Sequence, residues 1–147
     1  LINRSSTMIN DNLKMVGKLS IAINDTIVQE VDNLVVTSGK VWVAQRMNNV
    51  NTVMTHQAIG TGTATAVVAN TTLQTELVRV ALTSTTVTAN AIAYVATYAA
   101  GTGTGAITEA GMFDAASAGD MLCRTKFSVI NKGADDSMTI TWTVTVS

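Results

Sequence analysis

The sequence has no proline and only one cysteine, Cys123, and one histidine, His56, among its 147 residues. A single cysteine excludes an intrachain disulfide and CxxC sites, and a single histidine excludes histidine-rich zinc or iron sites. No apolar run approaches the roughly 18 residues of a membrane-spanning helix. The net charge is −1 and the nine basic residues are scattered, so we expect neither a nucleic-acid partner nor a membrane partner.

Charged side chains are also scarce, at 13% of the chain, about half of the roughly 25% usual in a soluble domain. Between Met47 and Thr108 the only charged residues are Glu76 and Arg79. A monomer with so few surface charges is prone to self-association. We therefore expect the protein to bury part of its surface against copies of itself or against another protein.

β-Branched residues, by contrast, are abundant: threonine supplies 24 residues and valine 18. These side chains fit the pleated, half-buried surface of a β-sheet. With 47% hydrophobic residues and a small net charge, the chain lacks the composition of a disordered protein. Its length fits one domain, which we place at residues 13–147, after a polar and aperiodic N-terminal arm at residues 1–12.

The clearest strand pattern lies at the C-terminus, where apolar residues alternate with threonine from Met138 to Val146. Met138, Ile140, Trp142 and Val144 face one way, and strict alternation of this kind indicates an antiparallel sheet packed on one side. Shorter extended patterns occupy residues 19–23, 27–36, 53–59, 77–83, 87–98, 106–113 and 121–130.

Turn residues separate these segments, and Thr37 or Ser38 can cap one short helix near residues 38–47. We therefore predict an all-β, mainly antiparallel fold: a jelly-roll-like β-sandwich with one short helix.

Residues capable of catalysis do not form a recognisable motif. His56 and Cys123 lie in expected strands, where a hydrogen-bonded histidine and a buried small thiol are the simpler interpretations. The segment 38–40 contains a Gly-Lys pair, but Leu34 stands where a Walker A loop needs its first glycine. The glycine-rich segment 101–105 precedes a strand pattern, so it lacks the helix N-terminus of a phosphate site.

Glu109 is the one acid inside an expected strand. An isolated buried charge is costly, so we expect Glu109 to pair with Arg79 or Arg124, or to accept hydrogen bonds from backbone amides. We therefore expect a protein that is not an enzyme, with no catalytic residues, no cofactor and no metal.

Six segments carry a likeness to known sequences: residues 30–40, 58–62, 76–80, 107–113, 121–124 and 131–142, of which ITEAG at 107–111 is the most specific. They resemble a family of structural virion proteins of tailed bacteriophages. The family includes tail-fibre-like proteins, and similar small β proteins serve as capsid cement. The resemblance implies a non-enzymatic particle protein.

From this resemblance we predict a capsid decoration or cement protein on the capsid exterior, which bridges and stabilises subunits of the major capsid protein. Its expected partners are the major capsid protein and copies of itself, as a homotrimer. The predicted contact residues are Ile2, Met8 and Ile9 in the arm and Thr139, Thr141 and Thr143 on the last strand. The alternatives are a tail, neck or fibre component and, from a different class, a carbohydrate-binding module on the virion surface.

Overall fold

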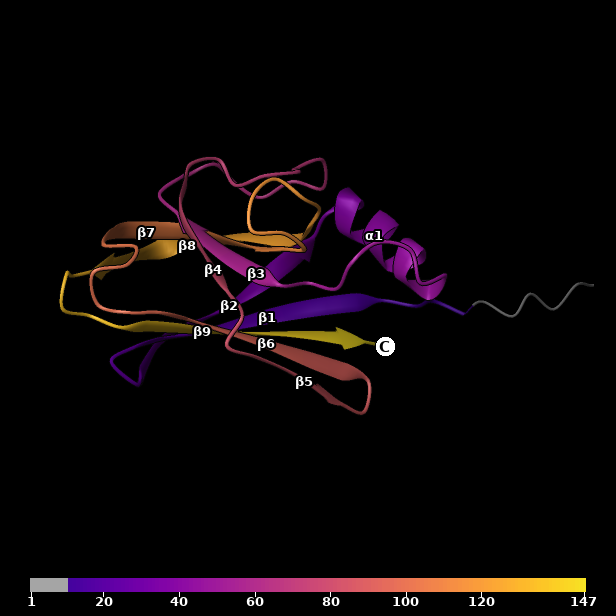
Figure 1. Cartoon of the computed structure of the whole chain (residues 1–147), viewed down its shortest axis with the longest axis horizontal. Coiled ribbons are helices and arrows are strands. Elements are labelled where there is room, and N and C mark those ends of the chain that lie inside the picture. The colour runs from indigo at the N-terminus through magenta and orange to yellow at the C-terminus, as the bar shows by residue number, and fades with distance from the viewer. Residues whose placement is uncertain (1–10) are drawn as a thin grey trace, which may run out of the picture.

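The computed structural model describes residues 11–147 and shows a mainly antiparallel β protein with one short helix (Figure 1). Residues 1–10, which include Ile2, Met8, Ile9 and most of the predicted arm, lie outside the described residues. The elements in chain order are β1 (Met15–Ile23), β2 (Thr26–Val35), α1 (Thr37–Met47), β3 (His56–Gly60), β4 (Glu76–Ala81), β5 (Ser84–Thr88), β6 (Ala91–Tyr98), β7 (Gly105–Phe113), β8 (Met121–Lys132) and β9 (Met138–Val146).

All nine strands belong to one curled sheet, in the order β4-β3-β7-β8-β2-β1-β9-β6-β5. Strand β2 pairs with β1 along most of its length, but with β8 only at Leu34 and Val35. The end of β2 therefore joins two halves of the sheet. We call β8, β7, β3 and β4 the first half of the sheet, and β1, β9, β6 and β5 the second half. In Figure 1 the first half lies above the second half.

This topology confirms the antiparallel β class and refines the prediction. The finer prediction, a jelly-roll-like β-sandwich, requires two separate sheets, whereas β2 joins the strands into one. Residue periodicity reports which side of a strand is buried, but it does not report which strands pair. The alternation of residues therefore could not predict the order of the strands in the sheet.

A tight turn joins β1 and β2 into a hairpin between the two extended patterns predicted at residues 19–23 and 27–36. Asn24 and Asp25 both have positive φ, at 47° and 67°, which is the backbone of the two-residue turn that suits the twist of paired strands. The single strand predicted at residues 87–98 is wrong, because Ala89 also has a positive φ, of 51°, and the chain reverses there into the β5–β6 hairpin. The Ala89-Asn90 pair lacks the glycine that usually marks such a turn.

Helix α1 matches the predicted helix, but its first turn differs. Neither Thr37 nor Ser38 caps it; Val36 occupies the N-cap position and makes no side-chain cap hydrogen bond. Ser38 Oγ instead donates to the Met121 carbonyl at 2.8 Å, which ties the helix to β8. Gly39 is required at this contact, because a Cβ there would lie 2.0 Å from the Leu122 carbonyl oxygen.

The core lies between the two halves of the sheet. The predicted apolar face of β9 is buried, and Trp142 is 0% exposed. It packs in one cluster with residues of both halves, among them Leu19, Tyr94, Ile59, Met112 and Phe127. The opposite face of the second half therefore faces outward.

Candidate interaction surface

The outward face of the second half carries three of the predicted contact residues, Thr139, Thr141 and Thr143. Strand β9 lies between β1 and β6, with Lys18 opposite Thr143 and Ser20 opposite Thr141. Because side chains alternate along a strand, these residues share the face opposite Trp142. We call this face the threonine surface and define it by Lys18, Ser20, Glu30, Asp32, Thr139, Thr141, Thr143 and Thr145.

The threonine surface is hollowed into a depression of about 390 Å³. Short serine and threonine side chains on β1 and β9 form part of its lining, and the longer Lys18, Glu30 and Asp32 line it from β1 and β2. Lys18 Nζ and Glu30 Oε2 are 4.0 Å apart and exposed, so this ion pair contributes little stability. The depression thus offers hydroxyl and methyl groups beside the charged side chains of Lys18, Glu30 and Asp32.

The hydroxyl groups give this surface hydrogen-bonding capacity of both kinds. A threonine hydroxyl donates one hydrogen bond and accepts two, so it adapts to a partner of either polarity. Thr97 Oγ1 and Thr139 Oγ1 already bond to one another at 3.2 Å. The lining contains no aromatic side chain that would form a platform for a sugar ring.

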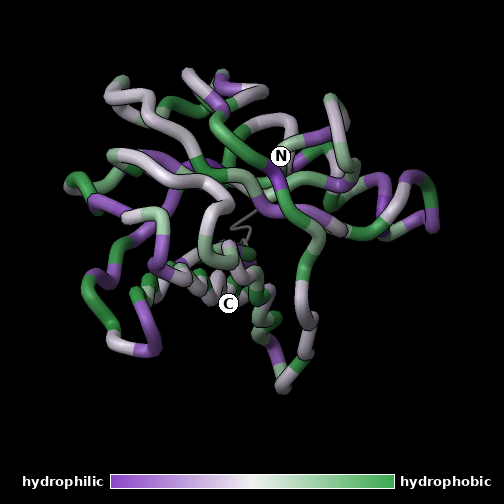
Figure 2. Tube along the Cα trace, turned by 60° about the vertical axis from the view of Figure 1, so that its left-hand side comes forward, coloured by the Kyte–Doolittle hydropathy of each residue, from purple (hydrophilic) through white to green (hydrophobic). Residues whose placement is uncertain are grey.

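Figure 2 shows the hydropathy of the described residues along the trace, which is largely pale or green with short purple stretches. The pale colour reflects threonine, serine and glycine, which lie near the middle of the hydropathy scale. Strongly hydrophilic residues are therefore spread thinly over the described part of the molecule.

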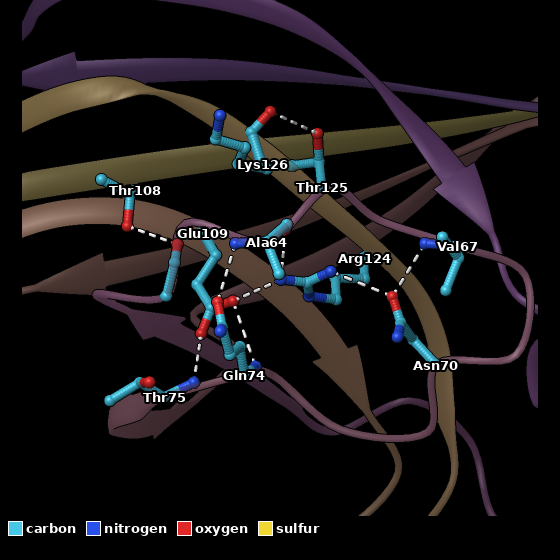
Figure 3. Close-up of polar contacts among 11 residues, drawn as sticks. Ala64, Val67, Asn70, Gln74, Thr75, Thr108, Glu109, Arg124, Thr125 and Lys126 are labelled. Carbon is cyan, nitrogen blue, oxygen red and sulfur yellow. Dashed lines mark hydrogen bonds and ion pairs between the residues drawn. The ribbon is translucent and has the colours of Figure 1, made fainter.

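A second cluster, in the first half, has the residue types of an active site. Glu109 Oε2 and Arg124 form an ion pair of 2.7 Å with side chains 0% and 1% exposed (Figure 3). The carboxylate also accepts hydrogen bonds from the backbone N–H groups of Gln74 and Thr75, at 3.1 and 2.8 Å. This confirms the prediction that Glu109 pairs with a basic residue and with backbone amides.

Arg124 completes the cluster by binding the same long loop. Its guanidinium donates to the Ala64 carbonyl and to Asn70 Oδ1, each at 2.9 Å. Residues 61–75 contain no regular strand or helix, so these bonds fix their course over β7 and β8. The Glu109 carboxylate is fully buried and accepts three hydrogen bonds, so its contacts hold the loop on the sheet.

Arg79, the other predicted partner of Glu109, has a different role. Its guanidinium lies 3.6 Å from the centre of the Phe113 ring and pairs with Glu76 at 2.7 Å. It also donates to the carbonyls of Ala115 and Ala118. Arg79 therefore clamps the β7–β8 connection against strand β4.

The remaining candidates for chemistry are also structural. His56 lies in β3, and its Nδ1 shares a hydrogen bond with Thr55 Oγ1 at 2.8 Å. Burial raises the pKa of the Cys123 thiol well above its usual value, against a smaller lowering by Asn33, so the nucleophilic thiolate is disfavoured. Burial also raises the pKa of Tyr98, whose hydroxyl donates to Gln57 Oε1.

Within residues 11–147, no group of three or more His, Cys, Asp or Glu side chains is arranged to hold a metal ion. In the same residues, no helix is long and apolar enough to cross a membrane.

The structure brings Thr139, Thr141 and Thr143 together on one surface, as their spacing predicted. It also shows an exposed feature that sequence reasoning missed, the edge strand β5, for which the only sequence signal was the lack of charge around it. No known protein family, curated protein or solved structure matches the chain. The likeness to phage virion proteins therefore stays a prediction.

Proposed function

We propose that the protein is a structural component of a tailed-phage particle, and specifically a capsid decoration or cement protein that binds the capsid exterior. The observation that carries this proposal is the threonine surface, a hollowed face that combines hydroxyl groups with Lys18, Glu30 and Asp32, on a sheet with a continuous core behind it. The resemblance of segments such as ITEAG to virion proteins supports the same role.

In this role the protein acts as a clamp. The sheet presents Thr141 and Thr143 in a fixed geometry, and each copy contacts neighbouring subunits of the major capsid protein through hydrogen bonds and methyl groups. Many copies on one shell, and contacts between copies, make attachment strong even where each contact is weak. The shell is thereby held against the pressure of its DNA.

A tail, neck or fibre component is the second candidate, because the resemblance also includes tail-fibre-like proteins. Both roles are structural, and the number of copies distinguishes them. Hundreds of copies in each intact particle, counted by quantitative mass spectrometry, indicate a cement protein. A dozen or fewer indicate a component of the tail.

The surface itself is tested by sedimenting the purified protein with empty phage heads. We expect the unchanged protein to bind, and the Thr141→Glu variant to bind at least about tenfold more weakly, because the longer side chain fills part of the depression and its carboxylate must lose water at the contact. Thr104→Glu places the same charge on an exposed residue outside the threonine surface and is expected to bind normally. Failure of the unchanged protein to bind heads contradicts the cement role.

A further inference from the structure

Strand β5 (Ser84–Thr88) forms a free edge of the curled sheet. It pairs with β6, and no other strand within residues 11–147 pairs with it. All five of its residues are exposed. In an antiparallel strand, alternate residues point their backbone N–H and C=O groups away from the partner, so the outer side of β5 presents a row of such groups.

This edge lacks the features by which proteins usually prevent pairing with another chain. Residues 80–108 contain no charged side chain, and the whole sequence contains no proline. The five residue pairs between β5 and β6 run in regular register, without a bulge. An uncharged, regular edge of β-branched residues is a template for another strand.

An apolar hollow of about 260 Å³ lies beside the edge, lined by Val87, Ala89, Asn90, Ala91, Ile92, Val144 and Val146. Val87 lies opposite Ile92, on the side of the hairpin that carries the buried Tyr94. The core-facing side of the sheet thus continues to the edge, where Val87 remains 68% exposed.

We propose that β5 pairs with β5 of a second copy of this chain, antiparallel and about a two-fold axis at Thr86. In this register Thr86 lies opposite Thr86 of the second copy, Thr85 opposite Val87, and Ser84 opposite Thr88. Threonine–valine and threonine–threonine pairs are favourable across strands. No charges meet, and the sheets of the two copies become one, with the second copy beside the apolar hollow.

The second copy is the occupant that this edge fits best. When two copies of the segment pair antiparallel, each residue lies opposite an uncharged residue of similar size. A neutral edge of this kind also imposes no requirement for an oppositely charged partner. The inference rests on the proposed function in that it names the surface by which copies of a particle protein meet. A two-fold contact gives a dimer rather than the trimer predicted from the sequence.

Five residues on each copy form a short interface. A stable complex usually buries at least about 1,000 Å² of surface, so neighbouring side chains would have to add to the contact. Pairing in solution is therefore expected to depend on protein concentration. On a particle, where copies are held close together, the same contact is strengthened by the high local concentration.

Sedimentation velocity of the full chain over a range of concentrations tests the proposal. We expect a monomer–dimer equilibrium in the unchanged protein and at least about a tenfold weaker equilibrium in Thr86→Lys, because two ammonium groups then meet at the axis. Thr26→Lys adds the same charge at an exposed residue of β2 and should dimerise normally. A monomer at every concentration, or equal dimerisation of Thr86→Lys, overturns the proposal.

Cysteine cross-linking tests the register without relying on a charge. Directly opposite residues have Cα atoms about 4.5–5.5 Å apart, within reach of a disulfide, so Thr86→Cys should cross-link the dimer upon oxidation. In Thr88→Cys the two cysteines lie about 13 Å apart, four residues along the strand, and should not cross-link. Cross-linking of Thr88→Cys alone overturns the register.

The native Cys123 is buried and provides the background in the unchanged protein. Attachment to empty heads is scored separately from these experiments. Heads that bind a strictly monomeric protein refute the β5 pairing alone, whereas a dimer that never binds heads refutes the cement role alone.

Discussion

The two halves of the curled sheet are stabilised in different ways. The first half buries an ion pair, Glu109–Arg124, beneath a long loop, and its edge strand β4 carries the Glu76–Arg79 pair. The second half contains Trp142 in its core, an uncharged edge strand β5 and an outward threonine surface. Charge is thus used inside and at the edge of one half and is nearly missing from the other.

This difference separates fold from association. In the first half the Glu109–Arg124 pair and Arg79 find partners in the same chain, so they hold a loop and a connection in place. In the second half the outward side chains are mostly hydroxyls beside the charged Lys18, and the free edge exposes backbone groups, so both keep capacity for hydrogen bonds to other molecules. The half with fewer charges is therefore the half with more hydrogen-bonding groups left for contacts.

Removing the largest core side chain of the second half is expected to have the largest effect. Trp142→Ala should lower the free energy of unfolding by about 5 kcal/mol, the upper end of the range for such truncations, because the ring is completely buried. Trp142→Phe keeps a ring and removes an indole N–H that has no hydrogen-bond partner in the described residues, so it should cost clearly less.

Urea unfolding followed by circular dichroism measures both variants. A nearly neutral Trp142→Ala would mean that the second half is not organised around this residue.

Neutralising the buried carboxylate of the first half is the next largest change. Glu109→Gln leaves the Arg124 charge buried without a counter-charge, and we expect the free energy of unfolding to fall by about 3 kcal/mol. The loss is not larger because glutamine still accepts one of the amide hydrogen bonds. Glu76→Gln makes the same chemical change in a partly exposed pair and should cost less than about 1 kcal/mol. Equal losses in the two variants would remove the distinction between the buried and the edge charges.

At the edge of the first half, Arg79→Lys keeps the charge but loses the planar group that stacks on Phe113 and bonds Glu76 through two nitrogens. We expect the free energy of unfolding, measured by heat or urea, to fall by about 1 kcal/mol. A matched Lys18→Arg change on the second half should have almost no effect, because the Lys18–Glu30 pair is exposed. A loss as large as that of Glu109→Gln would show that Arg79 has a larger structural role than its contacts indicate.

The sequence allowed several of these features to be predicted. The alternation from Met138 to Val146 placed Trp142 in the core and the threonines outside, because period two maps directly onto the two faces of a strand. The cost of a buried charge predicted that Glu109 has a partner, but it did not decide between Arg79, Arg124 and backbone amides. The hydrophobic pattern alone did not reveal the chain reversal at Ala89 or the pairing of β2 with both β1 and β8. Each of these depends on backbone geometry and on strand pairing across the fold. For the same reason the free edge of β5 became visible only in the structure.

A final contact joins the turns at one end of the sheet, and it has the smallest expected effect. The Asp136 carboxylate accepts hydrogen bonds from Asn24 Nδ2 and from the Gly133 N–H, each at 2.8 Å. These bonds, that of Asn24 first, lower the pKa of Asp136 from its usual value. A lowered pKa in the folded protein means that the carboxylate stabilises the fold above the usual pKa of aspartate, and that this contribution is lost as the pH falls through the lowered pKa.

Asn24→Ala should therefore move the pKa of Asp136 upward, towards its usual value, and reduce the loss of stability upon acidification. NMR titration of the Asp136 carboxyl carbon measures the shift directly. Asn90→Ala removes an amide that bonds the Val146 carbonyl instead, and it should leave the pKa of Asp136 unchanged. If Asn24→Ala also leaves it unchanged, the Asn24 side chain does not set the pKa of Asp136, and the two turns are held together by the backbone hydrogen bond from the Asn24 N–H to the Ser137 carbonyl instead.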